Sequence, residues 1–403
     1  MQQSFDFYNQ TKLNIEELFQ AYFDCRKNKR KTTQALEFEL EYQDELIKLH
    51  QEINNFSYQP RRSIAFIINK PVKREIFAGH FRDRIIHHLI FNKLNPLFEK
   101  EFIHDSYSCR VGKGTSYGIK RIDHFIKRCS LNYTKDCYIL KLDICGFFMS
   151  IDKKILFKKL EKFVLEKYKN KDYQILLYLC KKVIFNNPCH NYTIKGKISN
   201  WYGLPKNKSL FYSKKNCGLP IGNLTSQIFA NFYLNEFDHY LKHKLKIHFY
   251  GRYVDDFVII HGNKEVLKKL IDKIRNFLKI KLNLILHPDK IYLQDYQKGV
   301  MFLGSVIKPN RIYLRKRTFS NFYKKVNFFS NLIDQKKIVS NLQDKFLSSL
   351  NSYLGLMFHY QTYRLRKKIL KKYLSCYWNN WVILIDNKKF KKKIKILVLI
   401  HET

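Results

Sequence analysis

Two adjacent aspartates lie near the middle of the sequence, inside a run that otherwise favours a buried strand. The stretch reads RYVDDFVII, with Asp255 and Asp256 at its centre. Tyr, Val, Phe and Ile have high strand propensity whereas Asp has one of the lowest, so residue type and local preference conflict here. We expect a tight hairpin turn at these residues. Two carboxylates this close repel each other unless a cation lies between them.

A third carboxylate, Asp143, follows a second apolar run in YILKLDICGFFMSIDKK. Residues 138–142 predict a buried strand that Asp143 ends, and the Gly-Phe-Phe that follows turns the chain into a helix beginning near Asp152. The alternative role for Asp143 is a helix N-cap, which Asp152 fills better. A carboxylate at the end of a buried strand is more typical of a metal ligand.

Asp143, Asp255 and Asp256 together predict three carboxylates on two neighbouring strands, which is a site for two divalent cations. Carboxylate oxygens favour hard Mg²⁺, with Mn²⁺ as an alternative. Two such ions ~3.5–4 Å apart activate a hydroxyl nucleophile and hold the leaving pyrophosphate on either side of an in-line displacement at phosphorus. The predicted chemistry is nucleotidyl transfer.

The composition predicts a polyanionic partner. The chain has 75 Lys and Arg against 34 Asp and Glu, a formal net charge of +41 over 403 residues. Self-repulsion of this size costs folding free energy and normally persists where the surface contacts nucleic acid phosphates or anionic lipid. An AT-rich genome would explain part of the lysine excess but not the shortage of acidic residues.

Several features favour a cytoplasmic protein without membrane contact. No apolar run reaches the ~18 residues of a membrane span. The N-terminal MQQSFDFYNQTK has neither the basic nor the apolar region of a signal peptide. The nine cysteines include no CxxC pair, so we expect mostly buried thiols. Cys189-His190 is the one Cys/His neighbour pair, and zinc binding there is not expected.

The hydrophobic periodicity predicts the elements that surround these residues. Residues 14–56 indicate two helices joined by a basic loop at 26–31. Residues 63–68 and the following VKREIF indicate two strands with a basic hairpin at 70–74, and residues 80–100 indicate a further helix.

The chemistry-bearing stretches resemble, in order, the motifs of reverse transcriptases. The stretches that resemble palm motifs are LKLDICGFF, GLPIGNLTSQIFANFYLNEFD, YVDDF, HPDKIYL and GVMFLG. KREIFAGHFRDRIIHHLI and FIHDSYSCRVGKGTSYGIKR resemble the fingers, and SYLGLMFHYQTYRLRKKIL resembles a helical thumb. The similarity covers nearly the whole chain. It is most similar to the reverse transcriptases of diversity-generating retroelements, although bacterial reverse transcriptases linked to phage defence have related sequences.

The resemblance implies roles for individual residues at the catalytic centre. Asp143, Asp255 and Asp256 match the catalytic triad, and Ile144 joins them among the metal-binding residues. Lys290, in HPDK, matches a lysine that protonates pyrophosphate as it leaves.

The resemblance also implies a nucleotide site and a primer grip. Phe148 matches the bulky residue that would clash with a 2′-hydroxyl and so selects deoxynucleotides, the alternative being a plain core aromatic. Lys73 and Arg74 match basic residues that bind the triphosphate, although in so basic a chain either can simply be solvated. Gly222 and Gln227 also match nucleotide-binding positions. The primer grip corresponds to Phe302, Leu303 and Gly304, although FLG can also be any strand and turn.

One position departs from the wider family. Most reverse transcriptases have Pro-Gln-Gly where this sequence has Pro220-Ile221-Gly222. Ile221 offers only apolar surface to the incoming nucleotide, so we expect misinsertion to rise, as in retroelements that copy template adenines with errors. The alternative is that Gln227 replaces the missing amide.

The resemblance implies an α+β, right-hand polymerase fold with fingers, a palm of antiparallel sheet with packed helices, and a helical thumb. The expected divisions are a helical segment at 1–60, fingers at 61–135, palm at 136–310 with a basic insert at about 164–217, thumb at 311–385 and a basic tail at 386–403. The insert ends in WYGLPKNKSLFYSKKN, whose aromatic and basic residues can bind single-stranded nucleic acid or form a packed loop.

We therefore expect an error-prone RNA-directed DNA polymerase of a diversity-generating retroelement. The alternative is a phage-defence reverse transcriptase that works with a noncoding RNA. A non-catalytic RNA-binding protein would be expected to have lost one of the three aspartates. The expected partners are an RNA template, a DNA primer, deoxynucleotides, a noncoding or template-repeat RNA and a small helical accessory protein.

Overall fold

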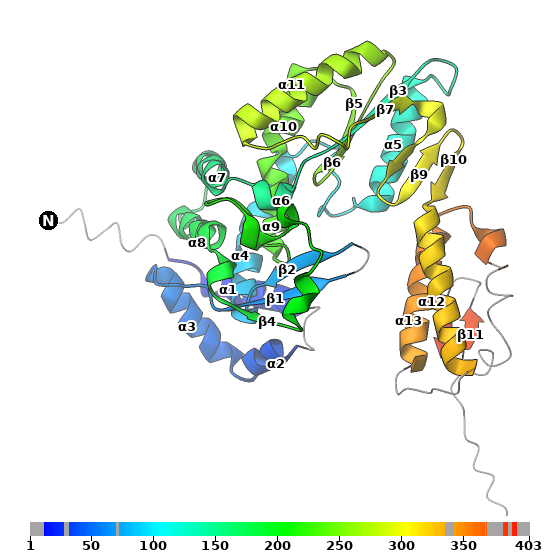
Figure 1. Ribbon diagram of the computed structural model, residues 1–403. Helices are drawn as coiled ribbons and strands as arrows, with labels where there is room; N and C mark the ends of the chain where they lie inside the picture. The colour runs from blue at the N-terminus through cyan, green and yellow to red at the C-terminus, as the bar shows by residue number, and fades with distance from the viewer. Residues whose placement is uncertain are drawn as a thin grey trace, which may run out of the picture. The chain divides into compact units, whose positions relative to one another are not determined.

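The computed structural model describes residues 12–27, 32–69, 72–334, 342–366, 368, 382–385 and 389–392. The chain divides into two compact units (Figure 1). The first unit comprises Met1–Gly114 and Leu140–Leu293, and the second comprises Thr115–Ile139 and Gln294–Thr403. Residues 115–135 of the predicted fingers therefore group with the predicted thumb rather than with the rest of the fingers.

The first unit is mainly helical. Its α-helices are α1 (Ile15–Arg26), α2 (Thr33–Leu40), α3 (Tyr42–Asn54), α4 (Phe81–Glu101), α6 (Phe147–Ser150), α7 (Lys153–Lys167), α8 (Tyr173–Phe185), α9 (Leu224–Tyr233), α10 (Asn235–His239) and α11 (Lys264–Leu282). Short 3₁₀ turns are η1 (Pro188–His190), η2 (Ile198–Trp201), η3 (Lys206–Lys208) and η4 (Leu210–Tyr212), and η5 (Tyr240–Lys244) is a π-helical turn.

Helix α4 is the centre of this unit. It contacts α1, α2, α8 and α9, and its apolar side chains are therefore buried on several sides rather than along one stripe. Phe98 of α4 stacks on Phe232 of α9 at 4.6 Å between ring centroids. The helix predicted at residues 80–100 is confirmed.

The N-terminal prediction of two helices is wrong in one respect, because the second is broken into α2 and α3. The chain leaves the helical region at Glu41, where φ is −127° and ψ is 33°. The break allows α2 to contact α4 while α3 contacts α8. It also stacks the Tyr42 ring on buried Tyr22 at 5.1 Å.

Two β-sheets contain strands of the first unit. One has the order β2-β1-β4, in which β1 (Ser63–Ile68) pairs antiparallel with β2 (Arg74–Ala78) and parallel with β4 (Tyr192–Ile194). The predicted hairpin is confirmed, although Lys70 and Pro71 at its tip lie outside the described residues.

The other sheet has the order β5-β6-β3-β7. Its strands are β3 (Tyr138–Asp143), β5 (Phe249–Tyr253), β6 (Asp256–His261) and β7 (Tyr292–Asp295). The apolar residues of β6 are buried, as expected for a strand covered on both faces. The strand predicted before Asp143 and the hairpin predicted at the paired aspartates are both confirmed.

The second unit contains α5 (Thr115–Cys129), a small antiparallel sheet and a helical pair. The sheet has the order β10-β9-β8, from β8 (Val300–Phe302), β9 (Ser305–Lys308) and β10 (Arg311–Leu314), and η6 (Tyr296–Lys298) precedes it. Helices α12 (Lys316–Asp334) and α13 (Leu342–Phe358) pack through a cluster that includes Phe322, Phe329, Phe346 and Leu354. The predicted helical character of this region agrees with these two helices.

The C-terminal stretch contains two strands that the sequence reading missed. Strand β11 (Val382–Ile385) pairs antiparallel with β12 (Lys389–Lys392), with Leu384 opposite Phe390. The first lies in the predicted thumb, and the second lies in the predicted basic tail. A β-branched run with an antiparallel partner explains the strand pairing despite the charge. Among the described residues, no helix is long and apolar enough to cross a membrane.

Candidate active site

The order of the central sheet brings the three predicted aspartates together. Strand β6 is the neighbour of β3, Asp143 is the last residue of β3, and Asp256 is the first residue of β6. Tyr253 pairs with Asp256, so Val254 and Asp255 form the two-residue turn between β5 and β6. This placement agrees with the predicted pair of neighbouring strands.

The turn is held in a costly backbone conformation. Val254 has φ +55°, which is rare for any non-glycine residue and especially for a β-branched one. Hairpin turns of two residues need positive φ at one or both positions, and Gly or Asn normally supplies it. A strained residue persists only where its surroundings hold it in place.

Arg252 is the residue that holds this turn. Its side chain is completely buried and donates from Nε and Nη2 to the two carboxylate oxygens of Asp238, at 2.7 and 2.5 Å. Its Nη1 donates to the Val254 carbonyl at 2.9 Å. Tyr250 donates its hydroxyl to the same Asp238 carboxylate at 2.6 Å. Burial acts to lower the Arg252 pKa, but the Asp238 charge and hydrogen bonds raise it, so the guanidinium stays charged.

The aspartate cluster concentrates negative charge in a partly buried place. Burial, followed by the charge of Asp143, raises the pKa of Asp255 to about 7. Burial raises the pKa of Asp256 to about 6, although Lys141 acts in the opposite direction. Carboxyl groups with raised pKa values lack full compensation of their charge, which a cation would supply.

Two lysines are paired with this cluster. Lys141 Nζ lies 3.2 Å from Asp256 Oδ2, and Lys290 Nζ pairs with Asp143 Oδ2. Burial acts to lower the Lys290 pKa, but the hydrogen bond and charge of Asp143 raise it above its ordinary value. Lys290 therefore carries its proton at neutral pH.

The segment that carries Lys290 runs antiparallel to the end of β3. Ile144 forms a bridge with Leu286, the His287 amide donates to the Asp143 carbonyl at 2.8 Å, and the Cys145 amide donates to the Ile285 carbonyl at 2.9 Å. These backbone bonds place HPDK beside the catalytic strand. The contact joins residues almost 150 positions apart in the chain.

The donor set fits a divalent cation. Within the described part of the chain, no three His, Cys, Asp or Glu side chains already converge as a finished metal site. Asp256 Oδ1, however, is buried and has no hydrogen-bond partner among the residues that the structure describes, and carboxylate oxygens are the ligands that hard cations prefer. The Ile144 side chain is apolar and buried, so only its main-chain carbonyl can be a ligand.

Two of the predicted nucleotide-site residues share one apolar cluster. Phe148 and Ile221 both pack, partly buried, against Ala65, Phe77, Met149 and Leu210. Lys73 lies in the segment before β2, where its Nζ donates to the Tyr202 carbonyl, and exposed Arg74 begins that strand. The Phe77 amide donates to the Ile221 carbonyl at 2.9 Å, which ties the 220–222 loop to β2.

Gly222 and Gln227 have different surroundings. Gly222 has φ +128°, and a Cβ there would lie 2.8 Å from Ile76 Cγ2, so only glycine allows the loop this close to β2. Gln227 is exposed on α9 and its Oε1 accepts from the Cys109 thiol at 3.2 Å. It is not a member of the cluster around Ile221, so nothing in this arrangement shows it replacing the missing amide.

The predicted primer-grip residues lie in the second unit. Phe302 is fully buried at the end of β8, and Leu303 and Gly304 form the turn to β9 with φ +48° and +86°. The Arg315 amide donates to the Gly304 carbonyl at 3.1 Å. Only the turn, and not the Phe302 ring, is available to a ligand.

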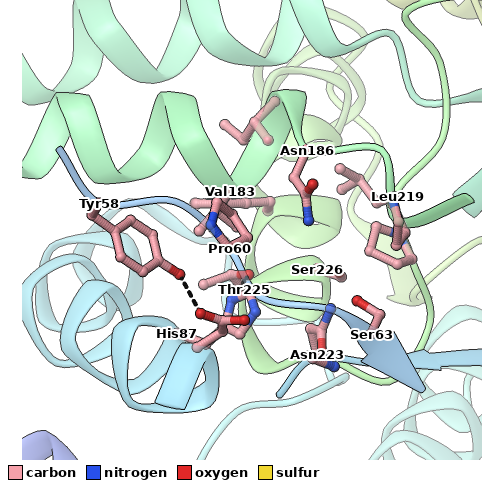
Figure 2. A pocket seen from close by; sticks show the side chains of 16 residues that line it. Tyr58, Pro60, Ser63, His87, Val183, Asn186, Leu219, Asn223, Thr225 and Ser226 are labelled. Carbon is pink, nitrogen blue, oxygen red and sulfur yellow. Dashed lines mark hydrogen bonds between the residues drawn. The ribbon is translucent and has the colours of Figure 1, made fainter. Parts of the chain in front are cut away.

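A pocket with both polar and apolar side chains is lined in part by Pro220 and Asn223 (Figure 2). Tyr58 donates to Asp83 at 2.8 Å, the Gly79 amide donates to the Asn223 side chain at 3.0 Å, and His87 Nδ1 lies 2.7 Å from Thr225 Oγ1. Burial lowers the pKa of His87 to about 3, so this imidazole is neutral. The Gly79 bond joins the segment before α4 to Asn223 of the loop, and the His87 contact joins α4 to the start of α9.

Sequence reasoning missed three charged residues of this site: Lys141, Arg252 and Glu75. Lys141 stands between two leucines of β3, which is the same kind of conflict that identified Asp255 and Asp256, whereas Glu75 follows Arg74 and Arg252 follows Gly251. Lys141 also lies two residues before Asp143, on the same face of β3. The sequence therefore indicated a charge in an apolar strand at Lys141, and it did not indicate the partner of any of the three charges.

Comparison with known proteins places these features in a family. The model of the family described as "Reverse transcriptase (RNA-dependent DNA polymerase)" matches residues 70–307. The chain is 21% identical over 323 residues to the COX1/OXI3 intron 2 protein of Saccharomyces cerevisiae, covering 65% of this chain and 34% of that protein. It is 24% identical over 326 residues to protein YkfC of Escherichia coli, covering 72% of this chain and 78% of that protein. The chain thus spans about a third of the first relative's length.

Solved structures with a related arrangement include telomerases from two yeasts. The Candida albicans enzyme in complex with a fragment of telomeric RNA is 12% identical with a TM-score of 0.47, covering 81% of this chain and 59% of that one. The apo enzyme from Candida tropicalis is 15% identical with a TM-score of 0.48, covering 78% and 58%. The mixture of helices and sheets in this chain agrees with the predicted α+β right-hand fold. Because the family model covers more than half of the sequence, the chain belongs to the reverse transcriptase (RNA-dependent DNA polymerase) family, as its motifs predicted.

Proposed function

We propose that this chain extends a DNA primer along an RNA template, with Asp143, Asp255 and Asp256 as its catalytic centre. The observation that carries this proposal is the meeting of the three carboxylates at the ends of β3 and β6. The raised pKa values of Asp255 and Asp256, and an Asp256 oxygen that has no hydrogen-bond partner among the described residues, support a centre that needs a cation. We assign two Mg²⁺ ions to it, held by these three residues and the Ile144 carbonyl.

The residues around the centre have separate tasks in nucleotidyl transfer. Ions bound there would lower the pKa of the primer 3′-hydroxyl and would neutralise charge on the leaving pyrophosphate. Lys290 is protonated beside Asp143 and can donate that proton to the pyrophosphate. Lys73 and Arg74 bind the triphosphate oxygens, and Phe148 excludes nucleotides that have a 2′-hydroxyl. Arg252 keeps Asp255 in place by fixing the turn through the Val254 carbonyl.

Primer extension on an RNA template with Mg²⁺ tests this assignment. Asp143→Asn and Asp255→Asn should each abolish extension while leaving RNA binding unchanged, because each removes a metal ligand and leaves the basic surface intact. Asp272→Asn is the matched control, since that carboxylate is exposed on α11 and pairs only with its helix neighbour Arg275 in the described structure. Wild-type extension by either catalytic variant would disprove the site.

We further propose that the enzyme is error-prone and diversifies sequences from a template-repeat RNA. The supporting observation is Ile221, which packs against apolar side chains and has no amide to offer the incoming nucleotide. A small helical accessory protein is the partner expected with such an enzyme. Sequencing of products made by the wild-type enzyme on an adenine-containing RNA tests the role. Errors concentrated opposite adenine would support diversification, whereas faithful copying would favour the defence role with a noncoding RNA.

A further inference from the structure

The insert loop, defined here as residues 186–217, is part of the sheet that carries the predicted triphosphate-binding residues. Its strand β4 pairs in parallel with β1, with Ser63 opposite Tyr192. The Ser63 amide donates to the Asn191 carbonyl at 3.0 Å, and the Lys195 amide donates to the Ala65 carbonyl at 2.9 Å. The loop is therefore fixed to the hairpin by main-chain bonds and is not a free appendage.

The buried carboxylate of Glu75 accepts hydrogen bonds from three groups of the insert loop. Glu75, the second residue of β2, is 1% exposed. It accepts hydrogen bonds from the Trp201 indole at 2.9 Å, the Ser209 hydroxyl at 2.7 Å and the Leu210 amide at 2.6 Å. Hydrogen bonds to an ionised group are about twice as strong as neutral ones. Glu75 thus holds η2 and η4 of the insert loop against the strand that begins with Arg74.

The residues held by Glu75 support the predicted nucleotide site. Leu210 is buried in one cluster with Phe77 and Met149, and Trp201 packs against that cluster. Phe148 and Ile221 pack against the same cluster. A shift of the insert loop would therefore be transmitted directly to both side chains, because packed interiors transmit strain.

The opposite side of the insert loop lies against the chain that follows Asp143. A Cβ on Gly146, which has φ +53°, would lie 2.7 Å from the Asn207 carbonyl oxygen. The Asn207 amide also donates to Cys145 Sγ at 3.7 Å. The loop therefore lies between the hairpin of β1 and β2 and the segment that carries Asp143 and Phe148.

We propose that the insert loop is a specificity-determining wall of the nucleotide site, and that Glu75 and Trp201 are positioning residues that act through Phe148 and Ile221. This inference rests on the proposed function. Phe148 can reject a 2′-hydroxyl only if its ring is held in place, and Glu75 supplies that restraint through Trp201 and Leu210. A loosened wall admits ribonucleotides and mispaired deoxynucleotides while the aspartates keep their geometry.

The test compares selectivity with turnover in single-nucleotide extension on an RNA template. Trp201→Phe keeps an aromatic side chain but removes the indole N–H donor and part of the ring that packs against the cluster, whereas Glu75→Gln removes the charge that all three donors face. Each variant should lower the ratio of kcat/KM for a deoxynucleotide to kcat/KM for the matching ribonucleotide, by roughly three- to tenfold for the loss of one or two such bonds. The change should lie mainly in KM, because the groups that hold the reacting atoms are untouched.

Two controls separate positioning from general destabilisation. Tyr202→Phe removes a hydroxyl from a 77% exposed ring of the same loop and should leave the ratio unchanged. Leu179→Ala opens a cavity in α8 and should lower the urea midpoint without changing the ratio.

The outcomes distinguish this inference from the proposed function. If Trp201→Phe and Glu75→Gln lower the urea midpoint but leave the selectivity ratio at its wild-type value, the wall is structural only and the inference is wrong. Should Glu75→Gln fail to fold, Trp201→Phe decides the question alone. If the wild-type protein extends no primer, the proposed function fails and the inference fails with it.

Discussion

Removal of the Arg252 guanidinium should cost stability and activity through two separable contacts. In Arg252→Met, the Asp238 carboxylate stays fully buried and keeps only the Tyr250 hydroxyl among the hydrogen bonds described above. Breaking a buried ion pair by removing one partner costs about 3–5 kcal/mol, because the remaining charge is uncompensated. The Val254 carbonyl also loses its donor.

A second substitution separates the two effects. Arg252→Met combined with Asp238→Leu removes both charges, and replacing a buried ion pair by apolar groups is often close to neutral. The double variant should regain much of the lost stability, apart from the bond to Val254 and the bond of the buried Tyr250 hydroxyl, which loses its Asp238 acceptor. Its extension rate should stay about tenfold or more below wild type, because a turn strained by roughly 1–3 kcal/mol relaxes once its anchor is lost.

The assays are urea denaturation, followed by changes in midpoint and slope, and steady-state primer extension. Arg275→Met is the matched control, since that arginine is half exposed and pairs with an exposed aspartate one helical turn away. Its effect should stay within about 0.5 kcal/mol. A loss below about 1 kcal/mol for Arg252→Met would refute the buried-charge argument. Wild-type extension by the double variant would refute the role of Arg252 in holding the turn.

Three further predictions follow from His87, the net charge and Ile221. His87 has a pKa of about 3 in the folded state and is neutral there, whereas in the unfolded chain it takes up a proton below ~pH 6.5. The contribution of His87 to the free energy of unfolding should therefore be fully present above that pH and should fall by up to about 1.4 kcal/mol per pH unit below it. His87→Gln should flatten this slope in urea midpoints measured between about pH 6.5 and 4.5. The logarithm of affinity for single-stranded RNA should fall linearly with log salt, by about 0.7 per phosphate neutralised, and a flat response would mean that the +41 charge serves another purpose. Ile221→Gln should lower misincorporation opposite adenine by up to roughly tenfold, and an unchanged error spectrum would place the infidelity elsewhere.

A helix start and a hairpin turn at the site could be predicted from the sequence, because each depends on residues only a few positions away. Asp152 was expected to start a helix, and its carboxylate accepts from the amides of Lys154 and Ile155 at 2.9 and 3.1 Å. The turn at Asp255 and Asp256 was expected because two poor strand formers interrupt a strand. Both predictions need only neighbours within a few residues.

Partners of buried charges could not be predicted, since they come from distant parts of the chain. Glu75 binds residues about 130 positions away, and Lys290 pairs with a carboxylate almost 150 positions earlier. Periodicity indicates that a charged residue lies in a buried strand, but it contains no information on what compensates the charge. The same reason explains the missed strand β12, because pairing with β11 outweighs the low strand propensity of lysine.

Ile221 has two consequences for the nucleotide site, one visible in the sequence and one visible only in the structure. The sequence indicated what this residue lacks, namely an amide for the incoming nucleotide. The structure shows what it contributes, which is apolar surface against Phe77, Met149 and Leu210. A glutamine placed there would have to turn its amide away from that cluster or lose about 1–3 kcal/mol by burying it unpaired. The missing polar contact and the support from the insert loop are therefore connected. With Ile221 in place of glutamine, the shape of the proposed nucleotide site depends on apolar packing, and Glu75 holds that packing in place.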